Sequence, residues 1–81
     1  MENTFLIDSD YILATNDNRY IAKERINGSN YTQHIRFALT YNTLEHAKNV
    51  ADRVNEINEK DGIPTRITRI FKREVTYTQI V

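Results

Sequence analysis

One stretch of the chain, residues 43–60, constrains the fold most, because its apolar residues recur at intervals of three and four. That spacing places them along one face of an α-helix, with charged and amide side chains on the opposite face. The residues of the apolar face are Leu44, Ala47, Val50, Ala51, Val54 and Ile57. Such a helix needs a second layer over its apolar face, so the rest of the chain must supply that layer.

Both ends of this helix carry residues that favour a start or a stop. Asn42 can cap the first turn together with Glu45, or Thr43 can cap it directly. At the other end, Gly62 suits a left-handed residue just beyond the helix, and Pro64 cannot continue it.

A β-hairpin is predicted before the helix. Residues 11–14 and 19–23 are rich in apolar and aromatic side chains, and residues 16–18 between them read Asn-Asp-Asn. Because Asn and Asp tolerate positive φ, this triplet is typical of a hairpin turn. Residues 27–30, Asn-Gly-Ser-Asn, predict an exposed loop.

Residues 34–41 fit two structures. The residues that alternate as in a strand are Ile35, Phe37, Leu39 and Tyr41, whereas Ile35, Ala38 and Leu39 also fit one helical turn. We favour a strand that leads into the helix.

The segment after Pro64, residues 65–81, is rich in Thr, Ile, Val and aromatic residues, as strands are. One alternation phase holds Ile67, Phe71, Val75 and Tyr77, and the other holds Ile70 and Ile80. The change of phase predicts a bulge or break within residues 69–72, and hence either one long bent strand or two short ones.

A chain of 81 residues suits a single domain, residues 1–81, of the α+β class. We expect a small, largely antiparallel sheet of three to five strands packed on the helix. The absence of cysteine excludes disulfides and thiolate zinc sites. Residues 1–4 lack the features of a signal peptide, and no apolar run approaches the ~20 residues of a membrane span. We therefore expect a cytoplasmic protein that does not bind a membrane.

Charge is balanced overall and uneven along the chain. Eleven basic and eleven acidic residues give a net charge of zero. Yet the charged residues within residues 1–18 are all acidic, and those within residues 64–81 are all basic except Glu74. We expect antiparallel neighbours to neutralise each other across the fold. The alternative is a functional basic stripe that binds nucleic acid.

No group of residues has the spacing of a catalytic, metal or cofactor site. Asp8 and Asp10 would share one face of a strand, and Ser9 between them makes a turn or a strand edge the simpler interpretation. His34 and His46 match no zinc spacing. We therefore expect no enzyme activity, no metal and no cofactor.

Tyrosine and basic residues supply the candidates for recognition. Tyrosine is enriched at protein interfaces, and the chain has five, too many for one thin core. Basic residues interleaved with aromatic rings are typical of single-strand nucleic-acid binding. The candidate interaction surface consists of Tyr20, Tyr31, Arg66, Arg69, Lys72, Arg73 and Tyr77.

The order of hairpin, extended segment, helix and terminal strand, with Tyr-Asn-Thr-Leu-Glu-His-Ala at residues 41–47, resembles small accessory proteins of temperate phages that infect Gram-positive bacteria. The resemblance implies a small α+β fold and assigns no functional residues. Thr43 and Ala47 also make the segment similar to the arm-binding domain of phage integrases, which reads DNA with a three-stranded sheet. This chain differs in lacking that hairpin's glycines and tryptophan and in having an extra strand after the helix.

Our hypothesis from the sequence is a non-enzymatic, phage-type accessory protein of the host cytosol that acts by protein binding. Its partner would be a host or phage protein, such as a factor of replication, transcription or defence. Chains of this size often gain stability by pairing, so a homodimer is compatible with the sequence. The alternative function is nucleic-acid binding through the basic C-terminal strand.

Overall fold

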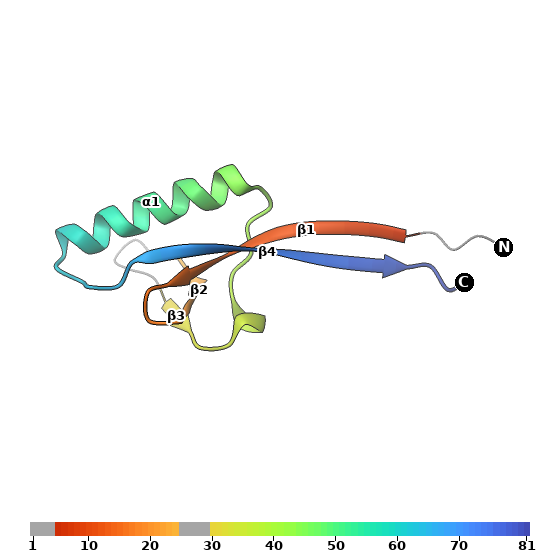
Figure 1. Cartoon of the computed structure of the whole chain (residues 1–81), viewed down its shortest axis with the longest axis horizontal. Helices are drawn as coiled ribbons and strands as arrows, with labels where there is room; N and C mark the ends of the chain where they lie inside the picture. The colour runs from red at the N-terminus through yellow and green to blue at the C-terminus, as the bar shows by residue number, and fades with distance from the viewer. Residues whose placement is uncertain (1–4, 25–29) are drawn as a thin grey trace.

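The structure is a computed structural model that describes residues 5–24 and 30–81. Its strands are β1 (Phe5–Thr15), β2 (Tyr20–Lys23), β3 (Asn30–Thr32) and β4 (Ile67–Thr78), and its helices are the 3-10 turn η1 (Ile35–Phe37) and α1 (Leu44–Lys60). The four strands form one antiparallel sheet in the order β3-β2-β1-β4. Helix α1 lies along one face of the sheet, and η1 lies on the other side (Figure 1). The predicted α+β class, with one helix on a sheet of three to five strands, is confirmed.

The turn between β1 and β2 forms where the Asn-Asp-Asn triplet predicted it. Asn18 adopts a φ of 62°, which asparagine tolerates better than most residues. The Thr15 hydroxyl accepts a hydrogen bond from the backbone N–H of Arg19 at 2.9 Å. The guanidinium of Arg19 in turn lies 2.7 Å from a carboxylate oxygen of Asp17. Side chains therefore hold this turn closed in addition to the strand ladder.

Helix α1 ends at the predicted residue, Lys60, and begins at Leu44, one residue after the start of the predicted range. Of the two predicted caps, Thr43 is the one used, because its hydroxyl accepts a hydrogen bond from the N–H of His46 at 3.1 Å. At the C-terminus, Gly62 has a φ of 68°. The N–H of Gly62 donates to the carbonyl of Glu59 and that of Ile63 to Asn58, the two bonds of a Schellman motif.

The core lies between α1 and the sheet. It consists of Leu13, Ile21, Tyr41, Ala47, Val50, Ala51, Val54 and Ile67. The ends of the predicted apolar helix face differ from expectation, since Leu44 is 41% exposed and Ile57 is only partly buried. Asn58, which was not predicted to face the core, is buried, and its amide donates to the carbonyl of Thr65 at 2.9 Å. An amide on the inner face thus ties the helix to the segment that leads into β4.

The predicted irregularity in the C-terminal segment is a register shift between β1 and β4. Thr15 lies opposite Ile67 and Ala14 lies opposite Arg69, so Thr68 is the extra residue, one position before the predicted range. The segment is one long strand, and the shift lets both Ile67 and Ile70 face the helix. The shift therefore places Ile67 and Phe71 on opposite faces of the sheet, although they share an alternation phase in the sequence.

The favoured strand over residues 34–41 is also wrong. The structure has η1 at Ile35–Phe37, followed by a single bridge between Tyr41 and Tyr11. The alternation misled because the exposed Ile35 and Phe37 project from a short 3-10 turn. Of the predicted loop at residues 27–30, positions 27–29 lie outside the described residues, and Asn30 begins β3.

Candidate interaction surface

Strands β1 and β4 continue together beyond the helix and the two short strands. They stay paired from Ala14↔Arg69 to Phe5↔Thr78. Their outer half, Phe5–Asp10 with Arg73–Thr78, is here called the arm, and the rest of the described chain is the body. The arm projects from the body as a two-stranded ribbon with the start of β1 and the end of β4 at its tip (Figure 1). It gives the molecule a longest dimension of 59 Å against 23 and 20 Å for the others.

The outer part of the arm exposes large apolar side chains on both faces. Leu6 lies opposite Tyr77 on one face, where their exposures are 66% and 56%. Ile7, 69% exposed, lies on the other face, because neighbouring residues of a strand point to opposite sides. Isolated two-stranded ribbons are marginally stable in water, and clustered exposed apolar groups mark binding sites. The arm is therefore the part of the described chain that stands to gain most from a partner.

An ion pair joins the two strands where the arm leaves the body. The Arg73 guanidinium donates to both carboxylate oxygens of Asp10, with Nε at 2.9 Å from Oδ1. Asp10 raises the pKa of Arg73 above its ordinary value, mainly through this hydrogen bond. Burial and neighbouring Asp8 change that pKa further, in opposite directions. One acidic residue from the start of the chain thus pairs with one basic residue from its end across adjacent strands, as the charge distribution predicted.

The backbone of β4 presents hydrogen-bonding groups along its outer edge. The N–H of Tyr11 donates to Tyr41 at 2.8 Å, which means that it points away from β4. Directly opposed residues of an antiparallel pair point both toward or both away from each other, so Lys72, opposite Tyr11, points its N–H away from β1. Alternation gives the same direction to Ile70, Glu74 and Thr76. In the described residues, β4 is the last strand of the sheet on this side.

The candidate basic residues from the sequence all have partners in this chain. Arg66 donates to the carbonyls of Ile63 and Thr65, the latter at 2.9 Å. Arg69 donates to the carbonyl of Thr15 at 3.2 Å and to Asn18 Oδ1 at 3.0 Å. The remaining two are Arg73, bound to Asp10, and Lys72, whose Nζ lies 3.3 Å from Glu74.

The tyrosine candidates are spread over different parts of the fold. Tyr31 packs against the core on the helix side of the sheet, and its hydroxyl accepts a hydrogen bond from Asn58 at 3.3 Å. Tyr20 lies on the opposite side, with its ring centroid 6.4 Å from that of Phe71. Tyr77 is in the arm. The structure therefore places Tyr20, Arg69, Arg73 and Tyr77 on one face of the sheet and does not gather all seven candidates on one surface.

A shallow apolar groove lies on the sheet face opposite α1. It has a volume of about 350 Å³ and lies between η1 and the base of the arm. Its lining residues are Ile12, Ile35, Arg36, Phe71, Lys72 and Arg73. Ile35 and Phe71, 46% and 39% exposed, form the apolar part of this groove. The Asp10–Arg73 ion pair separates them along the sheet from Leu6 and Tyr77 of the arm.

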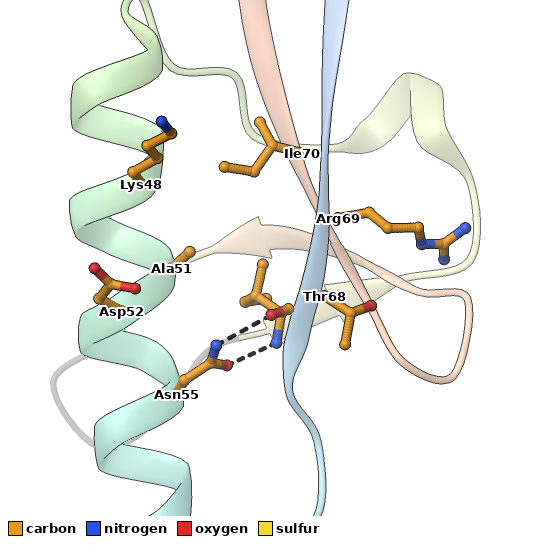
Figure 2. A pocket seen from close by; sticks show the side chains of 8 residues that line it. Lys48, Ala51, Asp52, Asn55, Thr68, Arg69 and Ile70 are labelled. Atoms are coloured by element: carbon orange, nitrogen blue, oxygen red, sulfur yellow. Dashed lines mark hydrogen bonds between the residues drawn. The ribbon is translucent and has the colours of Figure 1, made fainter.

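A second cavity, of about 250 Å³, lies between α1 and the start of β4 (Figure 2). Its central feature is Asn55, whose amide group binds the backbone of Ile67 in both directions. Asn55 Nδ2 donates to the Ile67 carbonyl at 3.0 Å, and the Ile67 N–H donates to Asn55 Oδ1 at 2.6 Å. The side chain thus occupies the place of a neighbouring strand at this point of the β4 edge.

Of the residues that define this surface, Tyr77 was predicted from the sequence, whereas Leu6, Ile7 and Asn55 were not. Leu6 and Ile7 stand in a short apolar run, and only the length of the β1–β4 ladder shows that they are exposed. Asn55 has no special signal in a helix rich in amides and charges. Among residues 5–24 and 30–81, no three His, Asp or Glu side chains cluster as metal ligands, and no helix is long and apolar enough to span a membrane.

Comparisons with protein-family models, with curated proteins and with solved structures found no match.

Proposed function

We propose that this protein acts by binding another protein through its arm and that it is not an enzyme. The observation that carries the proposal is the projecting two-stranded ribbon, whose Leu6, Ile7 and Tyr77 side chains are each more than half exposed. Apolar side chains on a marginally stable ribbon gain from being covered, and protein surfaces of complementary shape supply such cover. Tyr77 adds a hydroxyl that suits the wet rim of an interface.

The charges of this region favour a protein partner over nucleic acid. Binding to phosphates needs cations that are available to replace counterions. Arg69 and Arg73 are hydrogen bonded within the chain, and Lys72 is paired with Glu74. The nucleic-acid alternative requires these bonds to break, and it requires an affinity that falls steeply with salt and drops on Arg69→Ala plus Lys72→Ala.

We also propose, from the resemblance of the segment around residues 41–47 to phage accessory proteins, that the chain is phage-encoded. In that setting the partner is a host or defence factor in the bacterial cytosol. The resemblance supports this setting, and the arm supports the mode of action.

The test compares capture of proteins from a bacterial lysate by the wild type and by the double variant Leu6→Ser plus Tyr77→Ser. Both side chains are exposed in the arm, so the variant should keep the fold of the body. The matched control, Phe37→Ser plus Leu44→Ser, removes an aromatic and a leucine that are 59% and 41% exposed on the body. We expect a stoichiometric partner with the wild type and the control and its loss with the arm variant. Equal capture by all three chains, or no partner at low micromolar concentration, would contradict the proposal.

A further inference from the structure

The outer edge of β4 carries a row of backbone N–H and C=O groups that is too long for one side chain to cover. Asn55 covers the backbone of Ile67 at one end of the strand. From Ile70 onward, the outward N–H and C=O groups have no strand beside them among the described residues. Sheet edges are protected by bulges, covering groups or charged side chains. Here the bulge and the covering Asn55 lie at the start of β4, and the charges farther along its edge, Lys72 and Glu74, are of opposite sign and can therefore complement those of a second copy.

We propose that this edge binds a second copy of the chain, β4 against β4, antiparallel about a twofold axis at Arg73. The proposal goes beyond the proposed function, because it assigns a partner to a different surface. It uses the backbone edge of β4, whereas Leu6 and Ile7 on β1 remain exposed for a different protein. The residues that form the new ladder are Ile70, Lys72, Glu74 and Thr76 of each copy.

The hydrogen-bonding pattern restricts where the axis can lie. In an antiparallel ladder, residues that point outward must oppose residues that also point outward. Because outward residues alternate along β4, two identical strands meet this condition only when the axis passes through a residue. If the axis lay midway between two residues, every residue of one copy that points outward would lie opposite a residue of the other copy that points inward, and no ladder could form.

Charge complementarity then selects Arg73 among the residues of β4. An axis there places Lys72 opposite Glu74 of the second copy, and the symmetry repeats this opposite-charge pair. An axis at Lys72 would leave Glu74 opposite the uncharged Ile70, and an axis at Glu74 would leave Lys72 opposite the uncharged Thr76, so neither forms an opposite-charge pair. An axis at Phe71 would oppose Arg69 with Arg73. The charge of Arg73 itself, which meets its copy at the axis, is compensated within each chain by Asp10.

The same register gives the exposed apolar and aromatic residues of β4 suitable neighbours. Phe71 lies opposite Val75 of the second copy, so two partly exposed apolar side chains cover each other. Tyr77 lies opposite Arg69 of the second copy, a pairing that permits a cation–π contact. The joined sheet ends in β3 on both sides, so the association closes as a dimer and uses the β4 edge once per chain.

The test measures the mass of the protein by sedimentation from about 10 µM to about 1 mM, the range in which a small polar interface associates. We expect the wild type to be a dimer at the upper end of this range. In a K72E dimer, residues 72 and 74 of opposite copies would both be glutamate. In an E74K dimer, both would be lysine. Each substitution should raise the dissociation constant by roughly tenfold or more. Both side chains are more than half exposed, and circular dichroism checks that the variants fold.

Mixing the two variants makes the test specific for this register. In the K72E chain both positions of the pair carry glutamate, and in the E74K chain both carry lysine, so a mixed dimer has two complementary pairs. The mixture of K72E and E74K should therefore dimerise while each variant alone stays monomeric. The controls are K23E and E56K, which make the same changes of net charge at exposed sites of the body. Each control variant alone, and their mixture, should dimerise with the dissociation constant of the wild type.

A monomeric wild type at all concentrations overturns the proposal. So does a dimer that neither K72E nor E74K weakens, or a mixture that fails to associate. If the wild type is monomeric and still captures a lysate protein through the arm, the proposed function stands and this inference fails. If the wild type dimerises and captures nothing, the reverse holds.

Discussion

Asn58 and Tyr41 show two outcomes of burying a polar side chain in a thin core. Asn58 is 3% exposed, and its amide donates to the Thr65 carbonyl and to the Tyr31 hydroxyl. Tyr41 is equally buried, and its hydroxyl has no hydrogen-bond partner among the described residues. The hydrogen bonds of the Asn58 amide stabilise the fold, whereas the buried hydroxyl of Tyr41 destabilises it because it has lost water without gaining a hydrogen bond.

Asn58→Ala should lower the free energy of unfolding by about 1–3 kcal/mol, because the Thr65 carbonyl is left without its donor in the core. The matched control is Asn49→Ala on the exposed face of the same helix, which should be neutral or slightly stabilising. Urea denaturation measures both. Equal effects of the two substitutions would show that the Asn58 bonds contribute nothing.

Tyr41→Phe keeps the ring and removes the unpartnered hydroxyl, so stability at pH 7 should be unchanged or up to about 1 kcal/mol higher. Burial, and then the negative charge of Glu24, raise the pKa of Tyr41 above its ordinary value of 10.0. A raised pKa means that the stability from neutral Tyr41 is complete below pH 10 and is lost as the pH rises toward the folded-state pKa. Above pH 10 the wild type should therefore lose stability faster than Tyr41→Phe. Parallel pH profiles of thermal unfolding for the two proteins would contradict this.

At the scale of elements, the helix and the hairpin turn were predictable because their signals are local. A capping residue such as Thr43 or a turn residue such as Asn18 acts on the backbone beside it, whatever the rest of the chain does. The 3-10 turn at Ile35–Phe37 and the exposure of Leu6 were not predictable. Just after the turn the chain is held by a distant residue, since the N–H of Leu39 donates to the carbonyl of Ile21. The exposure of Leu6 depends on how far the β1–β4 pairing extends beyond the body.

Gly62→Ala should cost about 1 kcal/mol of stability, since Gly62 has a φ of 68° and a left-handed conformation is unfavourable for a residue with a Cβ. An added Cβ would meet no heavy atom within 4 Å, so the cost is one of backbone conformation and not of packing. Gly62→Asn should cost less, because asparagine adopts this conformation more readily. Thermal unfolding of the three chains gives the comparison, and an alanine variant as stable as the asparagine variant would contradict the backbone explanation.

At the scale of the whole molecule, the candidate site could be predicted in part. The tyrosine and basic residues predicted an interaction surface on the C-terminal strand, and Tyr77, Lys72 and Arg73 do lie on the arm or at its base. Tyr31 and Arg66, by contrast, serve the body, because their hydrogen bonds go to its own groups. The sequence could not reveal the projecting arm. The arm exists because the β1–β4 pairing is longer than the β1–β2 and β2–β3 pairings.

The outer edge of β4 is the feature on which the proposed association depends most, and site-resolved amide hydrogen exchange measured at low and at high protein concentration tests it directly. Phe71, Arg73 and Val75 point their N–H groups toward β1, so they should be protected to a similar extent at both concentrations. The amides that point outward, by contrast, should become protected only at high concentration, when a second β4 lies beside them. These are the amides of Ile70, Lys72, Glu74 and Thr76. Outward amides that exchange equally fast at both concentrations would contradict the association.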